Sequence, residues 1–118
     1  MIKGIGIDII EISRIKEAVE KYGDKFLSRV YTPQEIAYCK SLNQYRYPEL
    51  AVRFAAKEAY SKAVGTGIGA EVKWTEVEII NNELGKPHIA VKGKVLENVH
   101  VSLSHSRDSA VAQVVIEA

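Results

Sequence analysis

The sequence predicts an α+β fold in which an N-terminal strand and helices pack on a mainly antiparallel sheet. Isoleucine recurs at alternate positions within residues 2–11, a spacing typical of a strand. Residues 48–64 are mostly strong helix formers with no internal glycine or proline. After the glycine-rich break at residues 65–69, apolar runs alternate with turn residues, which indicates strands. At 118 residues, the chain is expected to form one domain, residues 1–118.

Helix start and stop signals follow the first strand. Ser13 is expected to cap a helix that runs to about Tyr22 and ends at Gly23. Thr32-Pro33-Gln34-Glu35 combines a cap, a proline at the first helical position and a glutamate three residues after the cap, which together form a capping box. This signal predicts a short helix to about Ser41.

The helix over residues 48–64 has a largely alanine apolar stripe that permits close packing, and Gly65 is expected to end it in a left-handed conformation. Strands are expected at about residues 73–80, 88–91, 99–105 and 110–116. Because the last strand has apolar side chains on both faces, we expect it to be covered on both sides, and one cover could be another subunit.

Composition and charge exclude several classes of protein. A net charge of +1 gives no bulk electrostatic signature of nucleic-acid or membrane binding. The one cysteine, Cys39, excludes an intrachain disulfide framework and favours a reducing compartment, by default the cytoplasm. No apolar run approaches the roughly 18 residues of a membrane span, and the N-terminus lacks the features of a targeting segment.

Asp8 and Glu58 are the candidate ligands for a divalent cation. Asp8 lies within an isoleucine-rich strand, and the bare Gly4 and Gly6 on its face leave room beside it. A buried carboxylate is costly unless it is paired or metal-bound, so Asp8 either pairs with a backbone group near the strand end or binds a metal. Mg²⁺ prefers one or two carboxylates together with phosphate oxygens and water.

Three cations, Arg53, Lys57 and Lys62, accompany Glu58 on the predicted long helix. They form either a solvated helix face or a set that binds a diphosphate-like ligand. His105, at a strand end, either hydrogen-bonds a phosphate or makes its hydrogen bonds within a turn. The sequence alone leaves both pairs of interpretations open.

The chain also carries six ordered sequence blocks. They are Gly4-Ile5-Gly6-Ile7-Asp8 with Glu11 and Arg14, Thr32-Pro33-Gln34-Glu35, Arg53-Phe54-Ala55-Ala56-Lys57-Glu58-Ala59, Lys62-Ala63-Val64-Gly65-Thr66-Gly67, Gly85-Lys86-Pro87, and Val101-Ser102-Leu103-Ser104-His105-Ser106. With these blocks the chain resembles the holo-acyl-carrier-protein synthase family of phosphopantetheinyl transferases over essentially its full length.

The resemblance implies the 4′-phosphopantetheinyl transferase fold and a specific reaction. The 4′-phosphopantetheine arm of coenzyme A would be transferred to a serine of apo acyl carrier protein, with Mg²⁺ as cofactor and adenosine 3′,5′-bisphosphate as the second product. Family members of this size are homotrimers with active sites between neighbouring subunits, which implies a homotrimer here as well.

The resemblance also implies roles for individual residues. Asp8 and Glu58 match the metal ligands, and Glu58, directly or through a metal-bound water, is the favoured general base. The positions that match contacts to the phosphates of coenzyme A or segments that flank its nucleotide are Arg53, Lys62, His105, Gly65 and Gly85-Lys86-Pro87.

Two further positions are matched by the resemblance. Arg14, on the first helix, matches a residue that meets the acidic carrier protein. Where the family often has further basic residues before the long helix, this chain has Gln44, Tyr45 and Arg46, and Arg46 is the candidate contact to the 3′-phosphate. A metal-dependent phosphohydrolase and a non-catalytic nucleotide-binding module remain the alternative functions.

Overall fold

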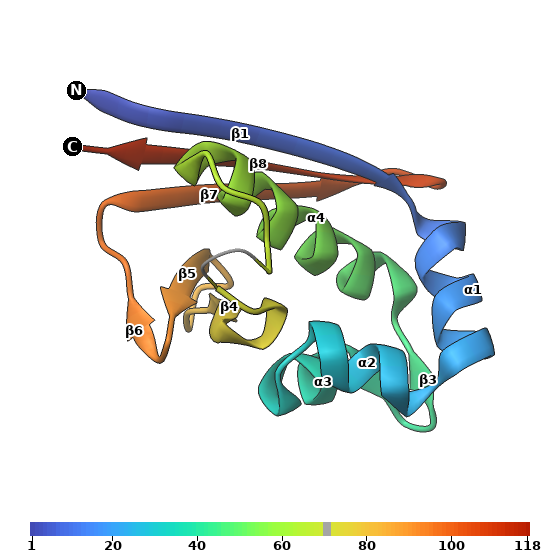
Figure 1. The fold of residues 1–118 in the computed structure, drawn as a ribbon. Helices are drawn as coiled ribbons and strands as arrows, with labels where there is room; N and C mark the ends of the chain where they lie inside the picture. Colours follow the sequence, from blue (N-terminus) through green and yellow to red (C-terminus); the bar gives the residue numbers. More distant parts are fainter. Residues whose placement is uncertain (70–71) are drawn as a thin grey trace.

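A three-stranded antiparallel sheet with a long helix on its inner face dominates the computed structural model, which describes residues 1–69 and 72–118 (Figure 1). The strand order is β1-β8-β7, so that β1 and β7 are the edge strands. The bounds are β1 Ile2–Glu11, β7 Val99–His105, β8 Ser109–Glu117 and helix α4 Tyr47–Val64. The predicted α+β class and the mainly antiparallel pairing are confirmed.

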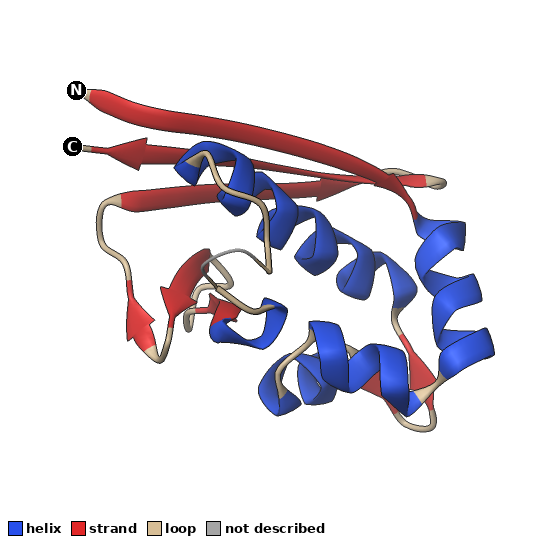
Figure 2. Cartoon of the chain, viewed as in Figure 1, coloured by secondary structure: helices blue, strands red, loops and turns tan. Residues whose placement is uncertain are grey.

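Smaller elements cover the side of α4 that faces away from this sheet (Figures 1 and 2). The helices are α1 Ile12–Tyr22, α2 Asp24–Val30 and α3 Pro33–Tyr38, with a 3₁₀ turn at Trp74–Glu76. The hairpin consists of β2 Lys40–Ser41 and β3 Gln44–Tyr45, and the second antiparallel sheet consists of β4 Val77–Asn81, β5 Pro87–Val91 and β6 Lys94–Val95. The core therefore surrounds α4, one part between α4 and α1–α3 and the other between α4 and the two sheets.

Strand β1 packs against the backbone of α4. A β carbon on Gly6 would overlap the carbonyl oxygen of Ala59, and one on Gly4 would overlap that of Ala63. The space beside Asp8 that the glycines provide is therefore taken up by the helix itself. Because β1 and α4 approach this closely, Asp8 comes next to the side chains on the C-terminal half of the helix.

The start of α1 differs from the sequence-based expectation. Ser13 is not its cap, because the helix begins at Ile12 directly after β1 and no side chain caps it. The N–H of Ile12 instead donates to the carbonyl of Asp108, 2.9 Å away in the β7–β8 turn. The predicted end is confirmed, since the N–H of Gly23 bonds to the carbonyl of Val19.

The region around α3 shows one confirmed signal and two corrections. The capping box of Thr32 and Glu35 is present as predicted. The helix ends at Tyr38 rather than Ser41, because the chain turns into the β2–β3 hairpin. Helix α2 was not expected; it is only seven residues long, too short to produce a clear periodic pattern.

The second half also differs in detail. The strand expected from residue 73 begins at Val77, since Trp74–Glu76 forms a 3₁₀ turn, and the two-residue β6 was not expected. The left-handed conformation of Gly65 at the end of α4, with φ of 97°, is confirmed. No helix within residues 1–69 and 72–118 has both the length and the apolar character needed to cross a membrane.

The two faces of the main sheet differ in burial. On the inner face of β8, Ala110, Ala112 and Val114 are buried under α4, as expected. On the outer face Ile5, Ile7 and Ile9 of β1 remain 58%, 58% and 68% exposed. Among the residues that the structure describes, no element supplies the second cover expected for the last strand, and beside it an apolar stripe on β1 faces outward.

Candidate active site

The two candidate metal ligands line one cleft. Asp8 comes from β1 and Glu58 from α4, and Arg14 of α1 lines the same cleft, whose volume is about 290 Å³. Its apolar walls include Phe26 and Phe54. We call this cleft, with Asp8, Arg14 and Glu58, the acidic cleft.

The charges in the acidic cleft are coupled. The Lys62 ammonium lies 3.0 Å from Asp8 Oδ1 and also donates to the carbonyl of Ile7 at 3.0 Å. Burial raises the pKa of Glu58, the negative charge of Asp8 raises it further, and the positive charge of Lys62 opposes both effects. Glu58 is thus a carboxylate whose proton affinity is increased, which suits a general base.

Two carboxylates in one cleft are a suitable donor set for Mg²⁺. This ion is usually held by one or two carboxylates, with phosphate oxygens and water completing its shell. Repulsion between Asp8 and Glu58, which contributes to the raised pKa of Glu58, would be relieved by a cation between them. Among the residues that the structure describes, no group of three or more His, Cys, Asp or Glu side chains is placed to hold a metal ion.

A second concavity collects most of the residues expected at coenzyme A. A cavity of about 510 Å³ is lined by Arg53, Gly85, Lys86, Pro87 and His105, together with other residues of α3, α4, β4 and β7. We call it the basic cavity. Most of the residues that the resemblance places at the nucleotide and the phosphates therefore converge here from α4, the β4–β5 turn and the end of β7.

Arg53 is held firmly in the wall of the basic cavity. Its side chain is 1% exposed; Nη1 donates to Glu49 Oε2 at 3.0 Å and Nη2 to Asn81 Oδ1 at 2.6 Å. The guanidinium also lies over the ring of Tyr38, 4.3 Å from its centroid. The His105 imidazole lies 3.9 Å from the other carboxylate oxygen of Glu49, so one glutamate faces both side chains.

The remaining candidates lie outside the basic cavity. Lys62 belongs to the acidic cleft through its contact with Asp8. Gly65 ends α4. Arg46, just before α4, donates to the Tyr38 carbonyl and lies 4.9 Å from the centroid of its ring, which brings it next to one wall of the cavity.

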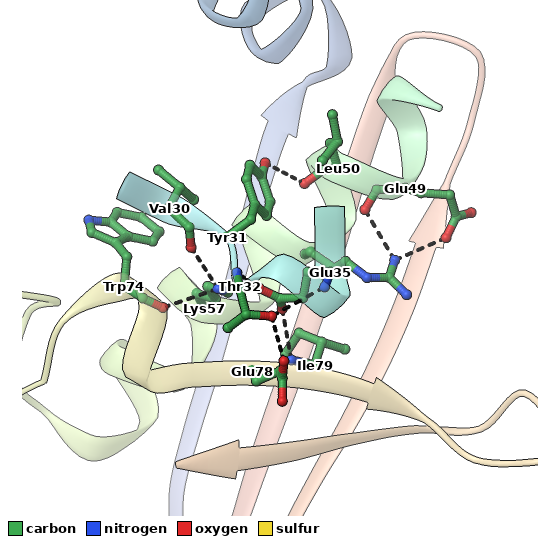
Figure 3. A network of polar contacts seen from close by, with 11 residues as sticks. Val30, Tyr31, Thr32, Glu35, Glu49, Leu50, Lys57, Trp74, Glu78 and Ile79 are labelled. Carbon is green, nitrogen blue, oxygen red and sulfur yellow. Dashed lines mark hydrogen bonds and ion pairs between the residues drawn. The ribbon is translucent and has the colours of Figure 1, made fainter. Parts of the chain in front are cut away.

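Lys57 fits neither interpretation of the helix cations, a solvated face or a diphosphate-binding set. Its side chain is fully buried, and its ammonium donates to Glu35 Oε1 at 2.6 Å and to the carbonyls of Val30 and Trp74 (Figure 3). It is therefore neither part of a solvated face nor available to a ligand in this conformation. A buried lysine persists only with such a full set of acceptors.

The acidic cleft and the basic cavity lie toward opposite edges of the main sheet. The cleft is built on β1, and the cavity is built partly on β7, with β8 between these two strands. The structure of one chain thus brings together Asp8 with Glu58 and Lys62, and separately Arg53 with His105.

Sequence reasoning missed three polar residues of the basic cavity: Tyr38, Glu49 and Asn81. Glu49 could have been found, because it precedes Arg53 by four residues, the spacing of a favourable helical ion pair. No local signal places Tyr38 or Asn81 there, since both reach the cavity only through tertiary packing.

Comparisons with known proteins agree with this geometry. A sequence profile of the 4′-phosphopantetheinyl transferase superfamily matches residues 4–115. The chain belongs to this superfamily. It is 54% identical over 118 residues to the holo-[acyl-carrier-protein] synthase of Geobacillus kaustophilus, with 99% of this chain and 90% of the relative covered.

Solved structures of family members are similar over the whole chain. The holo-(acyl-carrier-protein) synthase of Bacillus anthracis in complex with CoA (3′,5′-ADP) gives a TM-score of 0.85 at 49% identity, covering 100% of this chain and 98% of that one. The Helicobacter pylori holo-[acyl-carrier-protein] synthase in complex with coenzyme A gives 0.84 at 35% identity, covering 96% and 99%. The expected family, fold and enzyme class, a phosphopantetheinyl transferase, are confirmed.

Proposed function

We propose that this enzyme transfers the 4′-phosphopantetheine arm of coenzyme A to a serine of apo acyl carrier protein. The observation that carries the proposal is the acidic cleft, where a carboxylate of raised pKa lies beside a carboxylate–lysine pair. Its relatives are holo-[acyl-carrier-protein] synthases, and two of the matched structures contain coenzyme A or its nucleotide part.

In the proposed reaction the serine hydroxyl attacks the β-phosphate of coenzyme A. A phosphorus–oxygen bond to serine forms, and the bond to adenosine 3′,5′-bisphosphate breaks. Glu58 is the proposed acceptor of the serine proton. Lys62, whose side chain is 53% exposed, would move from Asp8 to a phosphate oxygen and offset the charge that develops there.

Asp8 and Glu58 are the residues proposed to hold Mg²⁺. When bound, the ion would neutralise the diphosphate and help to align it. Arg53, His105 and the Gly85-Lys86-Pro87 turn are proposed to bind the nucleotide and phosphates of coenzyme A, with Gly65 flanking the nucleotide and Arg46 near the 3′-phosphate. Arg14, in the wall of the acidic cleft, is proposed to meet the acidic carrier protein.

We further propose that the complete site is shared between subunits of a homotrimer. The acidic cleft lies toward the β1 edge and the basic cavity toward the β7 edge of one sheet, so a neighbouring copy could supply the missing half of each site. The exposed stripe of Ile5, Ile7 and Ile9 is an apolar surface suited to burial between copies. The cytoplasm is the proposed location, in keeping with the free Cys39.

Intact-mass analysis of an apo acyl carrier protein tests the proposed reaction. The carrier is incubated with the enzyme and coenzyme A, either with Mg²⁺ or with EDTA. We expect a gain of one phosphopantetheine only with Mg²⁺. Hydrolysis of coenzyme A without this gain would instead establish a phosphohydrolase, and intact coenzyme A with every carrier tried would favour a binding module.

Mixing two inactive variants tests the shared site. Asp8→Ala damages only the acidic cleft, and His105→Ala only the basic cavity. If sites form between copies, mixed oligomers contain some sites with neither substitution, and activity should return to a measurable fraction of wild type. If each chain holds its own complete site, the mixture stays as inactive as its two components.

A further inference from the structure

We propose that Asn81 is a positioning residue for coenzyme A, because its amide joins Arg53 to the β4–β5 turn. This inference rests on the proposed function, in which Arg53 and that turn bind coenzyme A. Asn81 ends β4 and lines the basic cavity, but it carries no charge and lies outside the six sequence blocks.

Both polar atoms of the Asn81 side chain are engaged. Its Oδ1 accepts from Arg53 Nη2 at 2.6 Å, and its Nδ2 donates to the carbonyl of Gly85 at 2.9 Å. One planar amide therefore links a side chain of α4 to the backbone of the turn. These two groups are separated by 32 positions in the sequence, and both line the basic cavity.

Asn81 holds Arg53 relative to the second sheet, whereas the ring of Tyr38 holds it relative to α3. Glu49 engages Nη1, but Glu49 lies one turn away on the same helix and does not restrain Arg53 relative to the sheet. The Nε of Arg53 is buried and has no hydrogen-bond partner among the described residues. Asn81 thus provides the hydrogen bond that ties the guanidinium to a different element.

The turn is otherwise held together locally. Asn82 Oδ1 accepts from the N–H groups of Leu84 and Lys86, each at 2.9 Å, whereas the Arg53 guanidinium donates to Glu49 and Asn81. Asn82 therefore shapes the turn, whereas Asn81 places it against Arg53. Because the Gly85 and Arg53 walls must both face the ligand, loss of this link should weaken binding without affecting the chemical step.

The test is the affinity of the full-length enzyme for coenzyme A, measured by titration calorimetry, together with steady-state kinetics. We expect Asn81→Leu, which removes both hydrogen bonds at similar size, to raise the Kd and KM for coenzyme A about tenfold, the effect of one lost bond to a charged group. The kcat and the KM for the carrier protein should stay within about twofold, since neither depends on this wall.

Adjacent asparagines provide the matched control. Two variants, Asn81→Asp and Asn82→Asp, add the same negative charge at neighbouring positions. Asn82→Asp keeps the side-chain oxygen that accepts hydrogen bonds within the turn, so its Kd for coenzyme A should change by no more than about twofold. Asn81→Asp keeps the acceptor for Arg53 but loses the donor to Gly85, and should fall between Asn81→Leu and wild type. This variant also serves if Asn81→Leu does not fold.

A double substitution shows whether Asn81 acts through Arg53. In an Arg53→Ala background, Asn81→Leu should change the Kd by less than about twofold, because the group that it positions is gone. The inference would be overturned if the two substitutions raised the Kd independently, so that their effects multiplied in the double variant. An unchanged Kd in Asn81→Leu, or a fall in its kcat as large as the rise in its KM, would also overturn it. If the wild-type enzyme itself neither binds coenzyme A nor modifies a carrier, the proposed function is wrong, and this result is distinct from a failure of the Asn81 inference alone.

Discussion

Two lysine–carboxylate pairs on α4, five residues apart, differ in nearly every physical respect. Lys57 and Glu35 are 0% and 1% exposed, with 2.6 Å between Nζ and Oε1. Lys62 and Asp8 are 53% and 17% exposed, with 3.0 Å between Nζ and Oδ1. The first pair joins α4 to α3 inside the protein, whereas the second joins α4 to β1 at the rim of the acidic cleft.

Burial, rather than residue type, decides what each pair does. Lys57 has its pKa lowered by burial, with Glu35 acting in the opposite direction, and its ammonium is held by two backbone carbonyls as well. Glu35 also accepts from the N–H of Ile79 through its second oxygen. Every group in the buried pair has a partner, whereas Lys62 makes two hydrogen bonds to described residues and keeps a third donor for a ligand.

The largest expected effect comes from breaking the buried pair. Lys57→Met leaves Glu35 buried without its cation, which should lower the free energy of unfolding by about 3–5 kcal/mol. Lys62→Met, the matched substitution in the exposed pair, should lower it by at most about 1 kcal/mol. Urea unfolding of both variants measures this difference, and similar losses would show that the comparison of the two pairs is mistaken.

Removing the carboxylate of the exposed pair should reduce turnover strongly. Asp8→Ala deletes a proposed metal ligand, and we expect kcat/KM to fall at least about a hundredfold, or roughly 3 kcal/mol. Thermal unfolding should change little, because Asp8 lies at an open cleft. Glu97→Ala, at an exposed site in the β6–β7 loop, is the control. Full activity of Asp8→Ala would contradict the proposal that Asp8 binds Mg²⁺.

Removing the lysine of the exposed pair should reduce kcat/KM less than removing Asp8, and it should also change the pH dependence of kcat/KM. Lys62 opposes the rise in the pKa of Glu58, so in Lys62→Met this pKa should rise further. A base with a higher pKa is ionised only at higher pH, so the acid limb of the kcat/KM profile should shift upward. At neutral pH we expect a loss of about tenfold. An acid limb in the wild-type position would show that Glu58 is not the base.

The smallest effect is expected at the mouth of the acidic cleft. Arg14→Ala should raise the KM for the carrier protein several-fold and leave the Kd for coenzyme A unchanged, because the side chain is proposed to meet only the acidic carrier. The effect should shrink at high salt, since it is a contact between exposed charges. Lys94→Ala, on β6, provides a comparison at an exposed site outside both concavities.

Local signals predicted much of the fold. The alternating isoleucines, the Thr32 capping box and the left-handed Gly65 all appear as expected, because each depends on neighbours within a few residues. Helix α2 and the β2–β3 hairpin were missed, since such short elements are stabilised by what they pack against. For the site, the sequence paired Asp8 with Glu58 correctly in one cleft.

The sequence by itself determined the family and the long helix, and it proposed which side chains react. Helical geometry also places Lys57 and Lys62 about 140° apart around α4, since each residue turns the helix by about 100°. Only the tertiary structure decided which of these two sides is buried, because that depends on the elements that cover the helix. For the same reason, the roles of Glu49 and Asn81 and the separation of the acidic cleft from the basic cavity emerge only when distant segments pack together.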